Sequence, residues 1–373
     1  MNTRRALGDG DRSHDDAGCE TTTNAPVTAS LTQVVMPVQY LGAVAIFQWP
    51  LAWAMLCFLL AVDLVWASQV GLTMGGGEIK AGLISALLAL SVAFRRRDRG
   101  IANLFEAIAL YLVSAAAGSV LMYLAASCAF PLQDAMMERL DRAIGFDWLA
   151  WHQALLDQPI LSLVLVVAYN SMFPQLVLLI FWFSPTGRSA RIGELLLLAG
   201  ATMVPTALIS AIWPTLGPFA VHGVGDVTYL RDLLALRASG PWHFESVALQ
   251  GIVTMPSYHT VMAVLLTYAF RHTGLVGYGI ATLNAVMLIS IPPIGGHYLV
   301  DVIAGAALAL GAIAVQRATT RRGVSRILLG LSRETLFGKA LGLARGSVVV
   351  PARISAQAVA VKSGRLHDAR DGT

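Results

Sequence analysis

Blocks of apolar residues, most of them close to twenty residues long, alternate along this chain with short polar segments. A block of that length can cross the hydrocarbon core of a bilayer as an α-helix. Backbone polar groups in lipid must be hydrogen-bonded within their own segment, so the blocks are predicted to be helices. The pattern predicts about eight transmembrane helices, at residues 51–74, 79–94, 104–128, 160–183, 192–213, 256–271, 275–292 and 297–316.

Two connections between these blocks are longer than the rest. Residues 129–159 hold charged side chains together with Phe146, Trp148 and Trp151, which is typical of a helix lying at the membrane interface. Residues 214–255 form the longest connection. Near the start of the chain, residues 34–48 are mildly apolar and are interpreted as a further interfacial segment.

The basic residues favour one orientation in the membrane. Four segments carry them: residues 95–99, the pair Arg188 and Arg191, Arg271, and the segment that begins at Arg317. All four fall on the same side when eight spans are threaded, and the positive-inside rule makes that side cytoplasmic. Both termini are then expected in the cytoplasm.

Composition agrees with an all-α integral membrane protein. Hydrophobic residues make up 56% of the chain and charged residues only 13%, whereas a soluble domain carries roughly a quarter charged residues. Three scattered cysteines give neither a disulfide framework nor a zinc pattern. Basic residues form no stripe with interleaved aromatics, so a nucleic-acid partner is not expected.

Two polar segments stand out at the ends of predicted spans. Met255–Thr260 opens the sixth span with His259, and Gly295–Asp301 opens the eighth with His297. The predicted topology places both segments on the extracytoplasmic side. His297 and Asp301 are four residues apart, a spacing that puts two side chains on one face of a helix.

The spacing of His297 and Asp301 is typical of a catalytic histidine and the carboxylate that orients it. A carboxylate can fix the tautomer of an adjacent imidazole and leave the other ring nitrogen as a nucleophile, which is the orienting principle of a catalytic triad. His259 can then protonate the leaving oxygen. Ser257 and Tyr258 lie at a helix start, where free N–H groups favour phosphate, and Gly295 and Gly296 allow close backbone approach. These four residues are the candidates for substrate binding.

Other functions use similar residues. A polytopic transporter, or a bis-histidine protein that binds a metal or haem, would also place histidines within a helical bundle. A membrane scaffold without catalysis is a third possibility. The neighbouring Asp301 and the paired glycines fit phosphate better than haem. No cluster with metal-ligand spacing is found beyond His297 and Asp301, so neither a metal nor another cofactor is expected.

The segments PSYH (256–259) and GGHYLVD (295–301) resemble the second and third signature motifs of the type-2 phosphatidic acid phosphatase superfamily. The resemblance implies a six-helix membrane core and metal-free cleavage or transfer of lipid phosphates through a phosphohistidine. It assigns His297 as the nucleophile, Asp301 as its orienting partner and His259 as the general acid. The substrate would be a lipid phosphate or phospholipid, and the acceptor water, a polyol such as inositol, or a lipid alcohol.

The chain departs from the usual motifs of that superfamily at several positions. Ile291 stands where an Arg is usual, Tyr258 stands where Gly is usual, and the basic first motif is absent. These losses, together with the segment WPTLGP (213–218), resemble the branch of inositol phosphorylceramide synthases and sphingomyelin-synthase-like transferases. The groups that bind the phosphate are therefore not identified by the motifs.

The resemblance also implies a division of the chain. Residues 1–33 are expected to be a disordered cytoplasmic tail, and 34–99 to hold the interfacial segment and two added transmembrane helices. Residues 100–316 would be the six-helix catalytic core, and 317–373 a basic cytoplasmic tail. The expected location is the plasma (inner) membrane, with the active site on the extracytoplasmic side.

Overall fold

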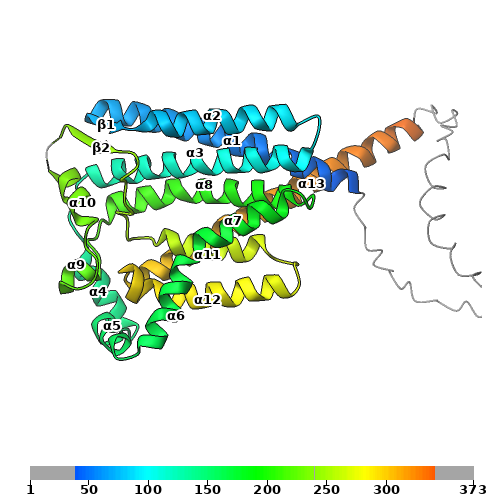
Figure 1. Ribbon diagram of the computed structural model, residues 1–373. Coiled ribbons are helices and arrows are strands. Elements are labelled where there is room, and N and C mark those ends of the chain that lie inside the picture. Colours follow the sequence, from blue (N-terminus) through cyan, green and yellow to red (C-terminus); the bar gives the residue numbers. More distant parts are fainter. Residues whose placement is uncertain (1–37, 239, 341–373) are drawn as a thin grey trace, which may run out of the picture. The chain divides into compact units, whose positions relative to one another are not determined.

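The computed structural model describes residues 38–238 and 240–340 (Figure 1). The expected tail at residues 1–33, and residues 341–373 of the C-terminal tail, lie outside this part. The chain divides into two compact units, Met1–Leu41 and Gly42–Thr373, and the description below concerns the second.

Helices dominate this unit, as the apolar pattern predicts. The elements are, in chain order, α1 (Val38–Val70), β1 (Leu72–Gly75), α2 (Gly77–Phe94), α3 (Arg99–Ser127), α4 (Asp134–Ala143), α5 (Trp148–Leu156), α6 (Pro159–Asn170), α7 (Met172–Phe183), α8 (Ser189–Ile212), α9 (Pro218–His222), α10 (Leu230–Arg237), β2 (Trp242–Glu245), α11 (Tyr258–Ala269), α12 (Leu275–Gly295) and α13 (Leu299–Ala340). The two short strands pair in parallel, with Leu72 opposite Trp242.

Six of the described helices are long and apolar enough to cross a membrane, which indicates an integral membrane protein. They cover Trp49–Val70, Gly77–Phe94, Arg99–Ser127, Ser189–Ile212, Leu275–Gly295 and Leu299–Thr320. A seventh span results if the bent pair of α5 and α6, which meet at 114°, is taken as one crossing. The predicted number of eight is therefore not confirmed.

The two remaining predicted spans are shorter helices than expected. The block at 160–183 is divided into α6 and α7 at Ser171. Pro174 explains the break, because proline has no N–H to donate to the carbonyl of Asn170 four residues earlier. The block at 256–271 contains the twelve-residue helix α11. Twelve residues rise about 18 Å, which is less than the hydrocarbon thickness of a bilayer.

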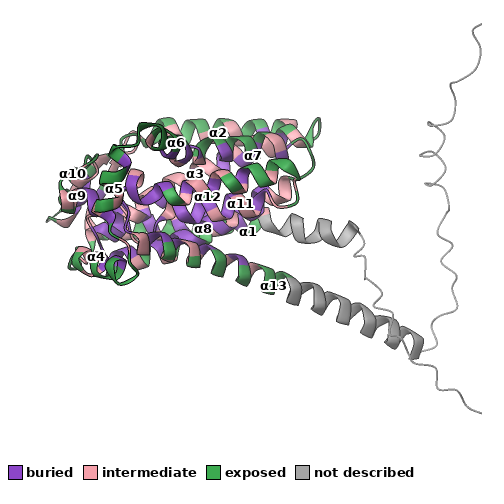
Figure 2. Ribbon diagram, turned by 90° about the horizontal axis from the view of Figure 1, so that it is seen from below, coloured by how far each residue is buried: buried purple, intermediate pink, exposed green. Residues whose placement is uncertain are grey.

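The core lies where the central helices meet, and Figure 2 shows buried residues concentrated around α3, α8, α11 and α12. Polar side chains join α7, α11 and α12 inside the bundle. The side-chain amide of Gln175 in α7 donates to the side-chain oxygen of Asn284 in α12 at 2.9 Å, and the Asn284 amide donates to the Thr267 hydroxyl of α11 at 2.9 Å. Such bonds hold helices together in lipid, where apolar side chains contact lipid as favourably as they contact another helix.

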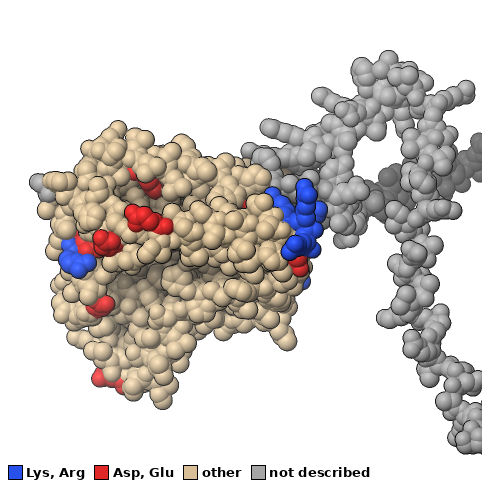
Figure 3. Space-filling model, turned by 45° about the horizontal axis from the view of Figure 1, so that its top comes forward, with Lys and Arg blue, Asp and Glu red and all other residues tan. Residues whose placement is uncertain are grey.

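The short elements gather at one end of the long helices (Figure 1). A second buried cluster lies there, in which Leu72, Tyr123, Leu233 and Ile252 pack together. On the face seen in Figure 3, Lys and Arg gather mainly at the opposite end, and most of the surface between carries no charge. The end with the short elements is where the two motif segments lie.

Candidate active site

His297 lies in the turn between α12 and α13. Gly296 ends α12 with a left-handed backbone (φ 64°), and α13 begins only at Leu299. The histidine therefore precedes the helix, and the expectation that it shares a helical face with Asp301 is wrong in that detail. The turn nevertheless brings the two side chains together, because Asp301 lies in the first turn of α13.

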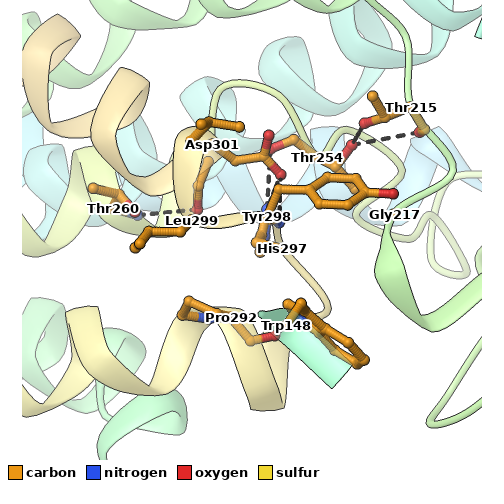
Figure 4. A network of polar contacts seen from close by, with 12 residues as sticks. Trp148, Thr215, Gly217, Thr254, Thr260, Pro292, His297, Tyr298, Leu299 and Asp301 are labelled. Atoms are coloured by element: carbon orange, nitrogen blue, oxygen red, sulfur yellow. Dashed lines mark hydrogen bonds and ion pairs between the residues drawn. The ribbon is translucent and has the colours of Figure 1, made fainter. Parts of the chain in front are cut away.

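The imidazole of His297 is held through Nδ1. This atom lies 3.0 Å from the carbonyl oxygen of Thr254 and 3.5 Å from Oδ2 of Asp301 (Figure 4). A carbonyl oxygen can only accept a hydrogen bond, so Nδ1 carries the proton and Nε2 is left with a free lone pair. Only 6% of His297 is exposed, which shields the ring from bulk water.

Asp301 is completely buried and joins the two motif segments. Its Oδ2 accepts a hydrogen bond from the backbone N–H of Tyr298 at 3.0 Å. Its backbone carbonyl accepts from the N–H of Ser257 at 3.0 Å, which ties the start of α11 to the start of α13. Among the described residues, Oδ1 of Asp301 has no hydrogen-bond partner.

His259 lies in the first turn of α11 and is half-buried. Its ring stacks on Tyr169 of α6, with ring centroids 4.5 Å apart and planes 15° apart. A methyl group placed on Gly295 would lie 2.7 Å from Tyr169 Cε2 and 3.1 Å from His297 Cδ2. The two histidines thus border the same tyrosine.

The four residues expected to bind substrate have different positions. Ser257 is fully buried, and its hydroxyl accepts from the Thr260 N–H at 3.4 Å to cap α11. Tyr258 points into the helical core, where its hydroxyl donates to the Ala199 carbonyl of α8 at 2.8 Å. Gly296 packs against the ring of Phe219. Gly295 lies close to the His297 ring, and the structure does not support a direct substrate contact for Tyr258.

Helix α4, which lies outside the motifs, fixes the position of the turn that carries His297. The Asp141 carboxylate accepts from the N–H groups of Leu299 and Val300 at 2.8 and 2.9 Å, and so caps α13. The Asp134 carboxylate accepts from the Tyr298 hydroxyl at 3.1 Å. Burial, followed by the charge of Asp134, raises the pKa of Tyr298 far above its ordinary value, so the hydroxyl remains a donor.

Asp134 also anchors the proline-rich segment at 213–218. It accepts from the N–H groups of Leu216 and Gly217 at 3.0 and 2.9 Å. One carboxylate therefore holds this segment and the residue next to His297 together. From α5, Trp148 donates to the Pro292 carbonyl at 2.9 Å and fixes the end of α12 (Figure 4).

Several of these residues are absent from the sequence prediction. Thr254 acts through its backbone, which leaves no mark in the sequence. Tyr169 lies in an apolar block, and its contact with His259 depends on how α6 packs. Asp134 and Asp141 do carry a signal, since their spacing of seven places both on one face of a helix. Within the described part of the chain, no three His, Cys, Asp or Glu residues are placed to bind a metal ion.

A family model described as the PAP2 superfamily matches residues 135–315. The match starts in α4, and it includes Asp141, Tyr169, His259, His297 and Asp301. It supports the type-2 phosphatidic acid phosphatase superfamily and, with it, a phosphatase-type enzyme acting on lipid phosphates. No curated protein and no solved structure matches the chain.

Proposed function

We propose that this membrane protein cleaves or transfers the phosphoryl group of a lipid phosphoester through a phosphohistidine formed on His297. The observation that carries the proposal is the environment of the His297 ring. The Thr254 carbonyl holds the proton on Nδ1, and buried Asp301 lies 3.5 Å from the same atom. Nε2 is then the nucleophilic atom, as a triad with histidine as the attacking group requires.

In the first step, Nε2 of His297 attacks phosphorus and the bond from phosphorus to the leaving oxygen breaks. His259 gives its proton to that oxygen, so the leaving group departs as a neutral alcohol. The ring of His297 carries positive charge in the intermediate, and the Asp301 carboxylate stabilises it. In the second step the acceptor attacks phosphorus, His259 takes the acceptor's proton, and the bond to Nε2 breaks.

The acceptor is water in a phosphatase and an alcohol in a transferase. The resemblance to inositol phosphorylceramide synthases favours an alcohol such as inositol or a lipid hydroxyl. The loss of the usual basic residues supports the same choice, because it distinguishes this chain from typical phosphatases of the superfamily.

We place the reaction at the extracytoplasmic surface, with the lipid drawn from the outer leaflet. Three of the four basic segments lie together at the end of the helices opposite the site. This arrangement supports an extracytoplasmic position for the site. Arg191 donates to the Ala269 carbonyl at 3.1 Å, and the guanidinium groups of Arg271 and Arg317 lie 3.7 and 4.8 Å from the centre of the Tyr268 ring. These arginines would face the cytoplasm under the positive-inside rule.

Purified protein incubated with labelled phospholipids, with and without inositol, tests the proposal. We expect a released or transferred phosphoryl group that persists in chelator and is lost in His297→Gln. His259→Ala should be severely impaired on a lipid phosphate but much less on an aryl phosphate, whose leaving group needs little protonation. Wild-type activity in both variants, with correct membrane insertion, would contradict the mechanism.

A further inference from the structure

Tyr169 connects the two histidines, although it belongs to neither motif. It lies in the last turn of α6, and its ring covers one face of His259. The position of Gly295 shows how close it is to the nucleophile. A methyl group there would lie 3.1 Å from the Tyr169 hydroxyl and 3.1 Å from Cδ2 of His297. Cδ2 is bonded to Nε2, so the hydroxyl lies near the edge of the ring that would carry the phosphoryl group.

The hydroxyl of Tyr169 is free to bind a ligand. Within the described residues it takes part in no hydrogen bond, whereas the hydroxyls of the two motif tyrosines, Tyr258 and Tyr298, each have a partner. A phenol is a good donor to an anionic oxygen. Gly295 is required beside it, because any larger side chain would collide with the ring of Tyr169.

We infer that Tyr169 binds the phosphoryl group at His297 Nε2 through its hydroxyl and holds His259 in place through its ring. The inference rests on the proposed function. The Tyr169 hydroxyl provides a neutral donor to the site. The motif there has Ile291, which is buried in the core, at the position where an arginine is usual. A donor aimed at the phosphoryl oxygens stabilises the charge that develops during transfer.

Two substitutions separate the two roles. Tyr169→Phe keeps the stacked ring and removes only the hydroxyl, so we expect a loss in kcat of about 10²-fold with both lipid and aryl phosphates. Inhibition by orthovanadate, which mimics the transferred group, should weaken by a similar factor. Tyr169→Leu also frees His259, so its further loss should be confined to the lipid phosphate. Tyr278→Phe is the matched control, because Tyr278 is 75% exposed on α12.

The outcomes distinguish this inference from the proposed function. Unchanged kcat and unchanged vanadate inhibition in Tyr169→Phe, beside an active wild type that depends on His297, would overturn the role of Tyr169 alone. A wild-type protein that processes no phosphate ester would overturn both. Loss in Tyr169→Leu without any loss in Tyr169→Phe would reduce Tyr169 to a packing residue for His259.

Discussion

At the scale of single residues, the backbone carbonyl of Thr254 changes what is expected of Asp301. In serine proteases the aspartate fixes the histidine tautomer, and its replacement by Asn costs about 10⁴-fold. Here the Thr254 carbonyl, at 3.0 Å, already holds the proton on Nδ1 of His297. In the proposed mechanism, Asp301 is left with the stabilisation of positive charge on the ring, from a distance of 3.5 Å.

We therefore predict a smaller loss for Asp301→Asn than the protease comparison gives. If the contact of Asp301 with the charged ring is equal to a hydrogen bond to a charged group, about 1.5–3 kcal/mol, its loss lowers kcat by roughly 10²-fold. Single-turnover kinetics on a lipid phosphate measure it, with circular dichroism to verify folding. A decrease close to 10⁴-fold would mean that Asp301, and not Thr254, fixes the tautomer.

The sequence predicts part of this site and omits the rest for a physical reason. His297 and Asp301 are close in sequence, so local geometry alone brings them together. Thr254 contributes a carbonyl that every residue possesses, and Tyr169 meets His259 only after α6 and α11 have packed. Contacts of those two kinds depend on tertiary structure, and no side-chain pattern along the chain records them.

At the scale of elements, the start of α13 is capped from a distant part of the chain. Tyr298, which precedes the helix, has no side-chain acceptor for the free N–H groups of the first turn. Asp141 provides it, although it is 158 residues away from Leu299 and 159 from Val300. A carboxylate at a helix N-terminus is also favoured by the helix dipole. Helix α4 thus holds the turn that carries His297.

We predict that Asp141→Ala lowers both stability and activity. Two partly buried N–H groups would lose their acceptor, at a cost of about 1–3 kcal/mol, and the His297 turn would be less well fixed. Thermal unfolding in detergent and kcat measure the two effects. Asp157→Ala, at an exposed position after α5, is the control. An unchanged melting temperature together with an unchanged kcat would show that α4 does not hold the turn.

The prediction of helices was correct where a long apolar block forms a single uninterrupted helix. Each of the six long helices corresponds to a predicted span. The predictions at 160–183 and 256–271 were too long because apolar composition continues where the helix does not. Pro174 interrupts the first, and the second reaches only from Tyr258 to Ala269. Apolar composition shows that a segment lies in lipid or in the protein core, but it does not show where a helix ends. Helix ends depend on backbone hydrogen bonds.

At the scale of the whole molecule, the orientation can be tested without settling the number of spans. Thr186 precedes α8, and Val247, which is 71% exposed, follows β2. Between these positions α8 is the one described helix long enough to cross, rising about 36 Å over its 24 residues. If α8 crosses the membrane, the two positions lie on opposite sides whether or not α6, α7 and α11 cross. Thr254, which contacts His297, follows Val247 in the same connection.

The positive-inside rule then decides which side is which. We predict that Val247→Cys, in a background lacking Cys19, Cys57 and Cys128, reacts with an impermeant thiol reagent on intact cells. Thr186→Cys, close to Arg188 and Arg191, should react only after permeabilisation, because these arginines favour the cytoplasm. The opposite labelling would place His297, and the lipid substrate proposed for it, at the cytoplasmic leaflet. Labelling of both on intact cells would show that α8 does not cross the membrane.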